Sequence, residues 1–128
     1  MEITGNQLQE KIKNGEKVIV ELWGTWCGPC KMMKPLFERV ASENTTSVLM
    51  YTMDVDQNRE VAMSFGIKSI PTILSFNNGN VVNTKVGLIQ EQQIKELGYN
   101  LVVMWENDWD RINKSIRTLQ RKYKSKTF

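Results

Sequence analysis

Two cysteines lie three residues apart in the stretch VIVELWGTWCGPCKMMKP, residues 18–35, and the chain contains no others. Such a pair can hold a metal, lie inert in a core, close a structural disulfide or act as a redox-active dithiol. A zinc site usually needs four ligands, and the chain has no histidine, although two chains could share a metal. A structural disulfide across so short a loop would constrain the unfolded chain little. The pattern therefore favours a reactive dithiol.

The residues around the cysteines favour a thiolate at the first of them. The apolar run ends at Trp23 and a helix is expected to begin near Gly28, which places Cys27 at a helix N-terminus. The positive end of the helix dipole stabilises a thiolate there. Cys30 follows one turn later on the same face, and Pro29 suits a first turn because its missing N–H group is not needed. We expect Cys27 to attack a substrate disulfide and Cys30 to resolve the mixed disulfide.

Glu21 interrupts the apolar run VIVELW at residues 18–23. It could lie in water on an edge strand, or it could be a buried acid. Burial would raise the pKa of its carboxyl group, because the charged form loses its hydration. A buried Glu21 could then exchange protons with Cys30 near neutral pH.

Short apolar runs rich in β-branched residues predict the strands that hold these groups. They are residues 17–23, residues 47–55 and two runs within residues 71–87. The last two runs are separated by Asn77-Asn78-Gly79-Asn80, and Asn-Gly is a strong hairpin signal. The sequence therefore predicts two single strands followed by a hairpin.

Apolar residues at helical spacing predict four helices around the strands. They are a first helix around Leu8 and Ile12 that ends at Asn14-Gly15, and helices at residues 28–43, 58–65 and 90–97. Helices that alternate with strands before a final hairpin predict an α/β fold, in which helices cover a mixed sheet.

The motif Trp-Cys-Gly-Pro-Cys-Lys at residues 26–31 resembles the thioredoxin family closely. The resemblance covers about residues 4–98, and it includes further matches at Trp23, Pro35, Ile70-Pro71-Thr72, Asn78-Gly79 and Val86-Gly87. It implies a thioredoxin fold, a central sheet with helices on both faces. It also implies a thiol–disulfide oxidoreductase that reduces protein disulfides, with no cofactor besides its dithiol and with an external reductase of the thioredoxin reductase type as electron donor.

The resemblance also implies a substrate-docking surface and a special peptide bond. In the family, the proline that matches Pro71 is cis and faces the dithiol. The docking surface is expected at Trp26, Gly28, Pro29, Ile70, Pro71, Val86 and Gly87. For Ile70 and Val86, simple core packing is the alternative.

Two positions depart from the family pattern. The family has an aspartate where this chain has Glu21, and often a lysine on the next strand, where this chain has Thr52. Without that cation, the pKa of Glu21 is expected to be higher still. Only Met1-Glu2-Ile3 precede Thr4, a candidate helix N-cap, so the family's first strand is expected to be shortened or absent.

The overall composition limits the classes of protein. The 128 residues suit one domain with a real core, and no apolar run approaches the roughly 20 residues of a membrane span. The N-terminus shows no apolar signal core. We therefore expect a monomer in a reducing cytoplasm, where a close cysteine pair is more often redox-active or metal-binding than structural.

Residues 99–128 lie outside the thioredoxin pattern. Within them, residues 106–128 hold seven Lys and Arg against three Asp and Glu. We expect a strand at about 101–105 and a basic amphipathic helix at about 108–124, both packed on the same domain. This extension weakly resembles the last strand and helix of patch-repair and homing-type endonucleases, but the chain has no Glu-x-Lys pair for nuclease chemistry.

The sequence thus supports two functions of different kinds. The first is a disulfide reductase that uses Cys27, Cys30 and Glu21, with no metal. The second is a thioredoxin-like scaffold or accessory subunit, whose basic C-terminal helix docks onto a nucleic-acid enzyme. Direct binding of the chain to nucleic acid is not expected.

Overall fold

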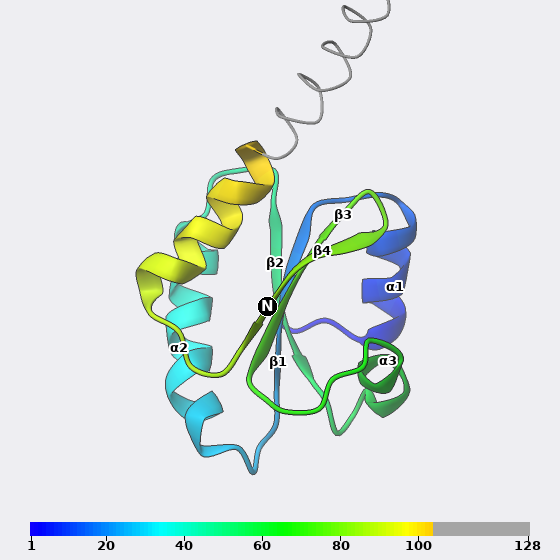
Figure 1. Cartoon of the computed structure of the whole chain (residues 1–128), viewed down its shortest axis with the longest axis vertical. Helices are drawn as coiled ribbons and strands as arrows, with labels where there is room; N and C mark the ends of the chain where they lie inside the picture. The colour runs from blue at the N-terminus through cyan, green and yellow to red at the C-terminus, as the bar shows by residue number, and fades with distance from the viewer. Residues whose placement is uncertain (104–128) are drawn as a thin grey trace, which may run out of the picture.

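The computed structural model of the chain describes residues 1–103, which form one mixed sheet between two layers of helices (Figure 1). The strands follow the spatial order β2-β1-β3-β4. They are β1 (Val18–Trp23), β2 (Leu49–Asp54), β3 (Thr72–Asn77) and β4 (Asn80–Val86). Strand β1 pairs in parallel with β2 and antiparallel with β3, and β3 pairs antiparallel with β4. The mixed sheet expected from the sequence is confirmed.

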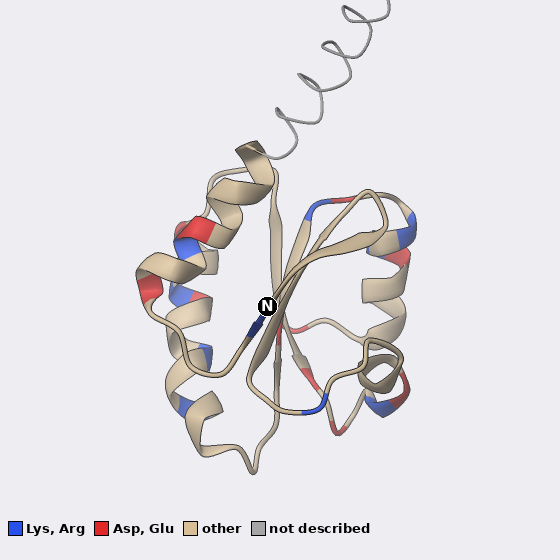
Figure 2. Cartoon of the chain, viewed as in Figure 1, with Lys and Arg blue, Asp and Glu red and all other residues tan. Residues whose placement is uncertain are grey.

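Helices cover both faces of this sheet. They are α1 (Gly5–Lys13), α2 (Gly28–Glu43), α3 (Arg59–Ser64) and a helix at residues 91–103. Figure 1 shows α2 and the helix at 91–103 on one face, with α1 and α3 on the other. Lys, Arg, Asp and Glu lie mostly on the helices and loops (Figure 2), but the central strand β1 carries Glu21.

The alternation of side chains along the strands gives each face its own core. The first cluster, under α1 and α3, includes Leu8, Val18, Val20, Leu22, Met53, Leu74 and Phe76. The second, under α2 and the helix at 91–103, includes Ile19, Met33, Phe37, Ile73, Ile94, Leu97 and Leu101. Because successive residues of a strand point to opposite faces, Glu21 lies on the α2 face together with Ile19.

Local signals place the first helix and the hairpin where the sequence predicts them. Thr4 caps α1 in a capping box, in which its side chain accepts from the Gln7 backbone N–H and the Gln7 side chain accepts from the Thr4 backbone N–H. The hairpin turns through Asn78 (φ 53°) and Gly79 (φ 84°). Positive φ at both central residues is the type I′ turn, whose twist matches that of the flanking strands.

The first strand is reduced to a single parallel bridge between Glu2 and Thr52. The backbone N–H of Ile3 donates to the Thr52 carbonyl, and the Thr52 N–H donates to the Met1 carbonyl, both at 2.9 Å. The shortened strand expected from the sequence is therefore confirmed. Residues 1–3 still reach the edge of the sheet, beside β2.

The expected break at Gly98-Tyr99-Asn100 and the expected strand from residue 101 are wrong. Residues 91–103 are helical throughout. Ile94, Leu97 and Leu101 recur at spacings of three and four, and all three are buried in the second cluster. Burial of these apolar side chains stabilises a continued helix by more than Gly98 destabilises it, since one glycine in a helix costs only about 1 kcal/mol.

The remaining predictions for the extension, a strand through residue 105 and a helix at 108–124, lie outside the described residues. Within residues 1–103, no helix is long and apolar enough to cross a membrane.

Candidate active site

Cys27 and Cys30 are joined by a disulfide at the start of α2, where their Cα atoms lie 5.3 Å apart. Cys27 is the N-cap residue, and the backbone N–H of Cys30 donates to its sulfur over 3.2 Å. The two residues are only 4% and 2% exposed. This N–H group and the positive end of the helix also stabilise the negative charge of a Cys27 thiolate after reduction. Pro29 lies in the first turn of α2, as expected.

The Ile70–Pro71 peptide bond is cis, which confirms the prediction. The Ile70 carbonyl oxygen lies 3.6 Å from the Cys27 sulfur, so this loop faces the disulfide. The backbone N–H of Gly87 donates to the Pro71 carbonyl over 2.8 Å. Segments from three distant parts of the sequence thus meet beside Cys27.

The residues expected to dock substrates differ in burial. Trp26 is 68% exposed, and Val86 is also largely exposed, so core packing does not explain Val86. Gly28 and Pro29 are exposed as well, at the tip of α2. Ile70 is half-buried and packs against the α1/α3 cluster, so it has a part in the core besides its place near Cys27.

Glu21 is a buried acid. Its exposed fraction is 0%, and within residues 1–103 neither carboxyl oxygen has a hydrogen-bond partner. Burial raises the pKa of Glu21 to about 8, because the charged form loses its hydration in the core. The alternative of a solvated edge-strand glutamate is therefore wrong, since β1 lies between β2 and β3.

Comparison with known proteins agrees with this arrangement. A family model described as Thioredoxin matches residues 1–98. The chain belongs to the thioredoxin family. Curated thioredoxins from Rickettsia bellii and Buchnera aphidicola are 38% and 34% identical to it. These alignments cover 69% and 75% of this chain, and 84% and 90% of the relatives.

Solved structures give the same result. A mutant thioredoxin from Halobacterium salinarum matches with a TM-score of 0.67 at 31% identity, over 76% of this chain and 85% of that one. The thioredoxin fold and the function expected from the sequence are confirmed: the protein is a thiol–disulfide oxidoreductase. The family implies disulfide-containing protein substrates and a reductase partner. These relatives do not favour the scaffold alternative, and the matched family model ends at residue 98, before the extension.

A cation acts on Glu21 from α2, an element that the sequence did not indicate. Thr52 is the register partner of Glu21 on β2, and its hydroxyl hydrogen-bonds the Glu2 carboxylate. Lys34, on α2, opposes the effect of burial and lowers the pKa of Glu21, whereas the charges of Glu38 and Glu2 raise it. The lysine on the next strand is absent, as expected, and Lys34 on α2 is a cation that the sequence did not indicate.

Lys34 is held in place by two neighbours. Its Nζ lies 4.0 Å from the centre of the Trp23 ring and 3.9 Å from Oε1 of Glu2. Oε1 of Glu2 also accepts from the Trp23 indole N–H over 3.0 Å. The N-terminal segment, the end of β1 and α2 thus meet in one polar cluster near the buried carboxyl group.

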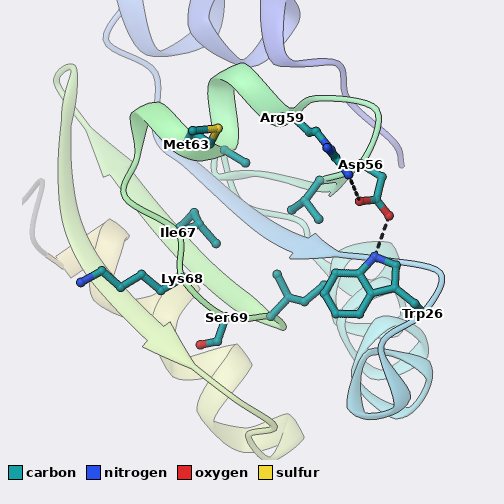
Figure 3. A pocket seen from close by; sticks show the side chains of 10 residues that line it. Trp26, Asp56, Arg59, Met63, Ile67, Lys68 and Ser69 are labelled. Carbon is teal, nitrogen blue, oxygen red and sulfur yellow. Dashed lines mark hydrogen bonds and ion pairs between the residues drawn. The ribbon is translucent and has the colours of Figure 1, made fainter.

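A further residue that sequence analysis missed is Asp56, which lies just after β2. Its Oδ2 accepts from the indole N–H of Trp26 over 2.7 Å. Figure 3 shows this contact at the wall of a pocket of about 280 Å³ between Trp26 and α3. This hydrogen bond holds the exposed indole of Trp26 at the wall of the pocket.

Proposed function

We propose that the protein reduces protein disulfides, with Cys27 as the nucleophile and Cys30 as the resolving thiol. The observation that carries this proposal is the position of the Cys27 sulfur. It accepts the Cys30 N–H at the start of α2 and lies against the Ile70 carbonyl, beside the exposed Trp26. A thiolate in this position is stabilised by the helix and lies next to the surface that substrates would contact.

The proposed reaction has two exchange steps. The Cys27 thiolate attacks one sulfur of the substrate disulfide, a new S–S bond forms, and the other substrate sulfur leaves as a thiolate that takes up a proton. The Cys30 thiolate then attacks the Cys27 sulfur and releases the second substrate thiol. Two electrons have passed to the substrate, and the Cys27–Cys30 disulfide remains, which is the form that the structure shows.

Glu21 is the proposed proton acceptor for Cys30. The resolving thiol must lose its proton before it attacks, and a free cysteine has a pKa of about 8.5. A carboxyl group with a pKa of about 8 is well matched to that proton near neutral pH. Its burial on the α2 face of β1 keeps the exchange away from bulk water.

The substrate is proposed to dock on the surface around the disulfide, where Trp26, Gly28, Pro29 and Val86 are exposed and Pro71 is buried beneath them. This docking surface consists of Trp26, Gly28, Pro29, Ile70, Pro71, Val86 and Gly87. The hydrogen bond from Gly87 to Pro71 supports it, because it fixes the hairpin beside the cis-proline loop.

The wider setting is proposed on the same basis. The dithiol needs no other cofactor, and an external reductase of the thioredoxin reductase type would restore it. A reducing cytoplasm suits a chain whose two cysteines are both in this pair. The protein would act as a monomer, with residues 1–98 as the thioredoxin domain and residues 99–128 as an extension packed on it. Nucleic acid would not be a partner.

Reduction of insulin disulfides tests the proposed roles. The wild-type protein, recycled by dithiothreitol, should accelerate insulin precipitation, and Cys27→Ser should reduce this rate to that of dithiothreitol alone. Cys30→Ser should instead trap a covalent complex with the substrate, visible on a non-reducing gel. Equal rates for the wild type and Cys27→Ser would refute the proposal. A scaffold would keep its function without either thiol, so complementation by the double serine variant separates the two functions.

A further inference from the structure

The buried carboxyl group of Glu21 must exchange its proton with water during each turnover of the proposed reaction. Once Glu21 has accepted the proton of Cys30, it has to lose that proton before it can accept another. Its side chain is nevertheless fully buried, and within residues 1–103 neither carboxyl oxygen has a hydrogen-bond partner. The exchange therefore needs further groups that can accept and donate a proton between Glu21 and the surface.

A row of three side chains leads from Glu21 to the edge of the sheet. Thr52 on β2 is the register partner of Glu21, and the bridge from the N-terminal segment pairs Thr52 with Glu2. Thr52 lies on the α2 face, because the next residue, Met53, packs in the α1/α3 cluster on the other face. Neighbouring strands lie about 4.8 Å apart. The row therefore crosses from the centre of the sheet to its edge in two steps of one strand each.

The hydroxyl group of Thr52 is the middle member of this row. Thr52 is 1% exposed, and its hydroxyl donates to Oε1 of Glu2. A hydroxyl oxygen also has two acceptor lone pairs, so it can accept a hydrogen bond from a protonated Glu21 at the same time. In the resting structure Glu21 has no partner, so this contact requires its side chain to rotate toward β2.

The Glu2 end of the row is both fixed and in contact with water. The Glu2 side chain is 49% exposed. Its Oε1 also accepts from the Trp23 indole N–H over 3.0 Å, and Nζ of Lys34 lies 3.9 Å away. These donors hold the carboxylate beside Thr52, although Glu2 belongs to the N-terminal segment.

The other charged groups that act on Glu21 are less suited to take up its proton. They come from α2 and are Lys34, which lowers the pKa of Glu21, and Glu38, which raises it. A lysine ammonium group has three donors and no acceptor, so Lys34 cannot accept a proton from Glu21 while it is charged. On β3, the register partner of Glu21 is the apolar Ile73.

We infer that Thr52 and Glu2 form a relay that carries the proton of Glu21 to water. The protonated Glu21 donates its proton to the Thr52 oxygen while the Thr52 hydroxyl proton moves to Oε1 of Glu2. Glu2 then passes a proton to water, and the Thr52 hydroxyl rotates back toward Glu2. The same steps in reverse load Glu21. The inference rests on the proposed function, in which Glu21 accepts the proton of Cys30.

The test measures how fast Glu21 exchanges its proton in the oxidised protein, where neither cysteine titrates. The glutamate side-chain carboxyl carbons are labelled with carbon-13, and Glu21→Gln identifies the Glu21 resonance by its absence. A pH titration of this resonance gives the pKa. Its line shape at the pH of half protonation, near 8 in the wild type, gives the exchange rate.

The threonine variants test the middle of the relay. Thr52→Val should slow the exchange at least about ten-fold, because it removes a positioned proton-transfer group. Thr52→Ser keeps the hydroxyl and should exchange like the wild type. Thr72→Val changes a buried threonine on the opposite face and should leave the exchange rate unchanged. If Thr52→Val changes the rate only in proportion to its shift in pKa, the inference is wrong.

Glu2→Gln separates a relay from a purely electrostatic effect. The charge of Glu2 raises the pKa of Glu21, so its removal should lower that pKa and by itself speed the loss of the proton. The relay predicts the opposite, a slower exchange at the lower pKa. Glu43→Gln, at an exposed position of α2, should change neither quantity. A faster exchange in Glu2→Gln would overturn the relay.

Two further results separate the competing explanations. If Lys34→Met slows the exchange and Thr52→Val does not, the proton leaves through Lys34 and the inference is wrong. The insulin assay distinguishes this failure from a failure of the proposed function. A wild-type protein that reduces insulin but exchanges its Glu21 proton independently of Thr52 has no relay. A protein that shows relay exchange but does not reduce insulin supports the relay and contradicts the proposed function.

Discussion

The two faces of the sheet bury side chains of different kinds, although they share the same strands. On the face under α1 and α3, β1 contributes Val18, Val20 and Leu22 to an apolar cluster. The buried polar side chain that β3 adds there, Thr72, donates its hydroxyl to the Ser69 carbonyl over 2.6 Å. On this face, no buried side-chain nitrogen or oxygen of the described residues lacks a hydrogen-bond partner.

The face under α2 buries polar atoms that have no partner. Within residues 1–103, the buried side-chain oxygens that lack a hydrogen bond belong to Glu21, Ser75 and Asn77. Ser75 and Asn77 share this face with Ile73, which packs in the α2 cluster. Each such group costs free energy, and the face that carries this cost is the one that also carries Cys30. Both faces thus bury an apolar core, but the unpaired polar side chains and the reactive groups lie on the α2 face.

Among the substitutions that test this difference between the two faces, Glu21→Gln should have the largest effect on the free energy of unfolding. The pKa of Glu21 is raised from 4.5 to about 8 in the folded state, so the folded protein binds the proton more tightly than the unfolded chain. The stabilisation that comes from this proton is therefore fully present below about pH 4.5. It is lost as the pH rises toward 8, which lowers the free energy of unfolding by up to roughly 5 kcal/mol. Urea unfolding at pH 5 and pH 8.5 should show this loss in the wild type and not in Glu21→Gln.

Glu43→Gln is the matched control, because it removes an exposed carboxylate from α2. It should follow the wild-type pH dependence. Glu21→Gln should also slow disulfide reduction above neutral pH, with both thiols still present by thiol titration. A wild-type protein whose stability does not fall between pH 5 and 8.5 would contradict the burial of a proton-binding group.

Leu8→Ala tests the apolar face. Leu8 lies on α1, is fully buried and is remote from the dithiol. Its truncation should lower the free energy of unfolding by about 3 kcal/mol, from lost burial and the cavity left behind. Reduction rates per folded molecule should not change. Gln9→Ala, at an exposed position on the same helix, should have little effect, and a large loss of activity in folded Leu8→Ala would break the division between the faces.

Ser75→Ala and Thr72→Val compare the two faces within a single strand. Within residues 1–103 the buried Ser75 hydroxyl has no hydrogen-bond partner, so its removal should stabilise the protein by about 1 kcal/mol. The Thr72 hydroxyl has a partner, so its removal should destabilise the protein by a similar amount. Thermal unfolding of both variants measures the contrast, and shifts of the same sign would argue against it.

The smallest effect should come from Lys34→Met. Lys34 lowers the pKa of Glu21, so its loss should raise that pKa above about 8. The pH at which the reduction rate rises should therefore increase. The corresponding free-energy change is only about 0.5–1 kcal/mol, because water reaches Lys34 and weakens its interaction with Glu21. Lys31→Met is the control from the same helix. An unchanged pH profile of the reduction rate would mean that Lys34 interacts with Trp23 and Glu2 but has no effect on Glu21.

Much of this architecture could be predicted from local sequence signals. The apolar run at residues 18–23 locates the central strand, and Asn78-Gly79 predicts a turn that only residues tolerant of positive φ can make. The spacing of Cys27 and Cys30 within a helix start predicts the dithiol. In each case, neighbours in the sequence decide the structure, so no tertiary contact has to be known.

The features that were missed depend on contacts between distant residues. Lys34 and Asp56 act through partners on other elements, and nothing near them in the sequence reveals those partners. The helix beyond Gly98 is a different kind of miss. Gly98-Tyr99-Asn100 indicates a local break, but the burial of Ile94, Leu97 and Leu101 along one face of the helix overrides it.

Gly5 is the residue through which α1 packs closely against α3, the helix that forms one wall of the pocket. Its N–H donates to Oδ1 of Asn58 over 2.8 Å, and a Cβ atom at this position would lie 2.5 Å from Cγ2 of Val61 on α3. Any larger residue would push apart two helices, one of which carries Ala62 and Met63 of the pocket. The residue types at positions 5 and 61 should therefore change together when variants are selected for folding. In a randomised library, alanine at position 5 should survive mainly where Val61 has become smaller, and such paired variants would change the wall of the pocket through a contact outside the active site.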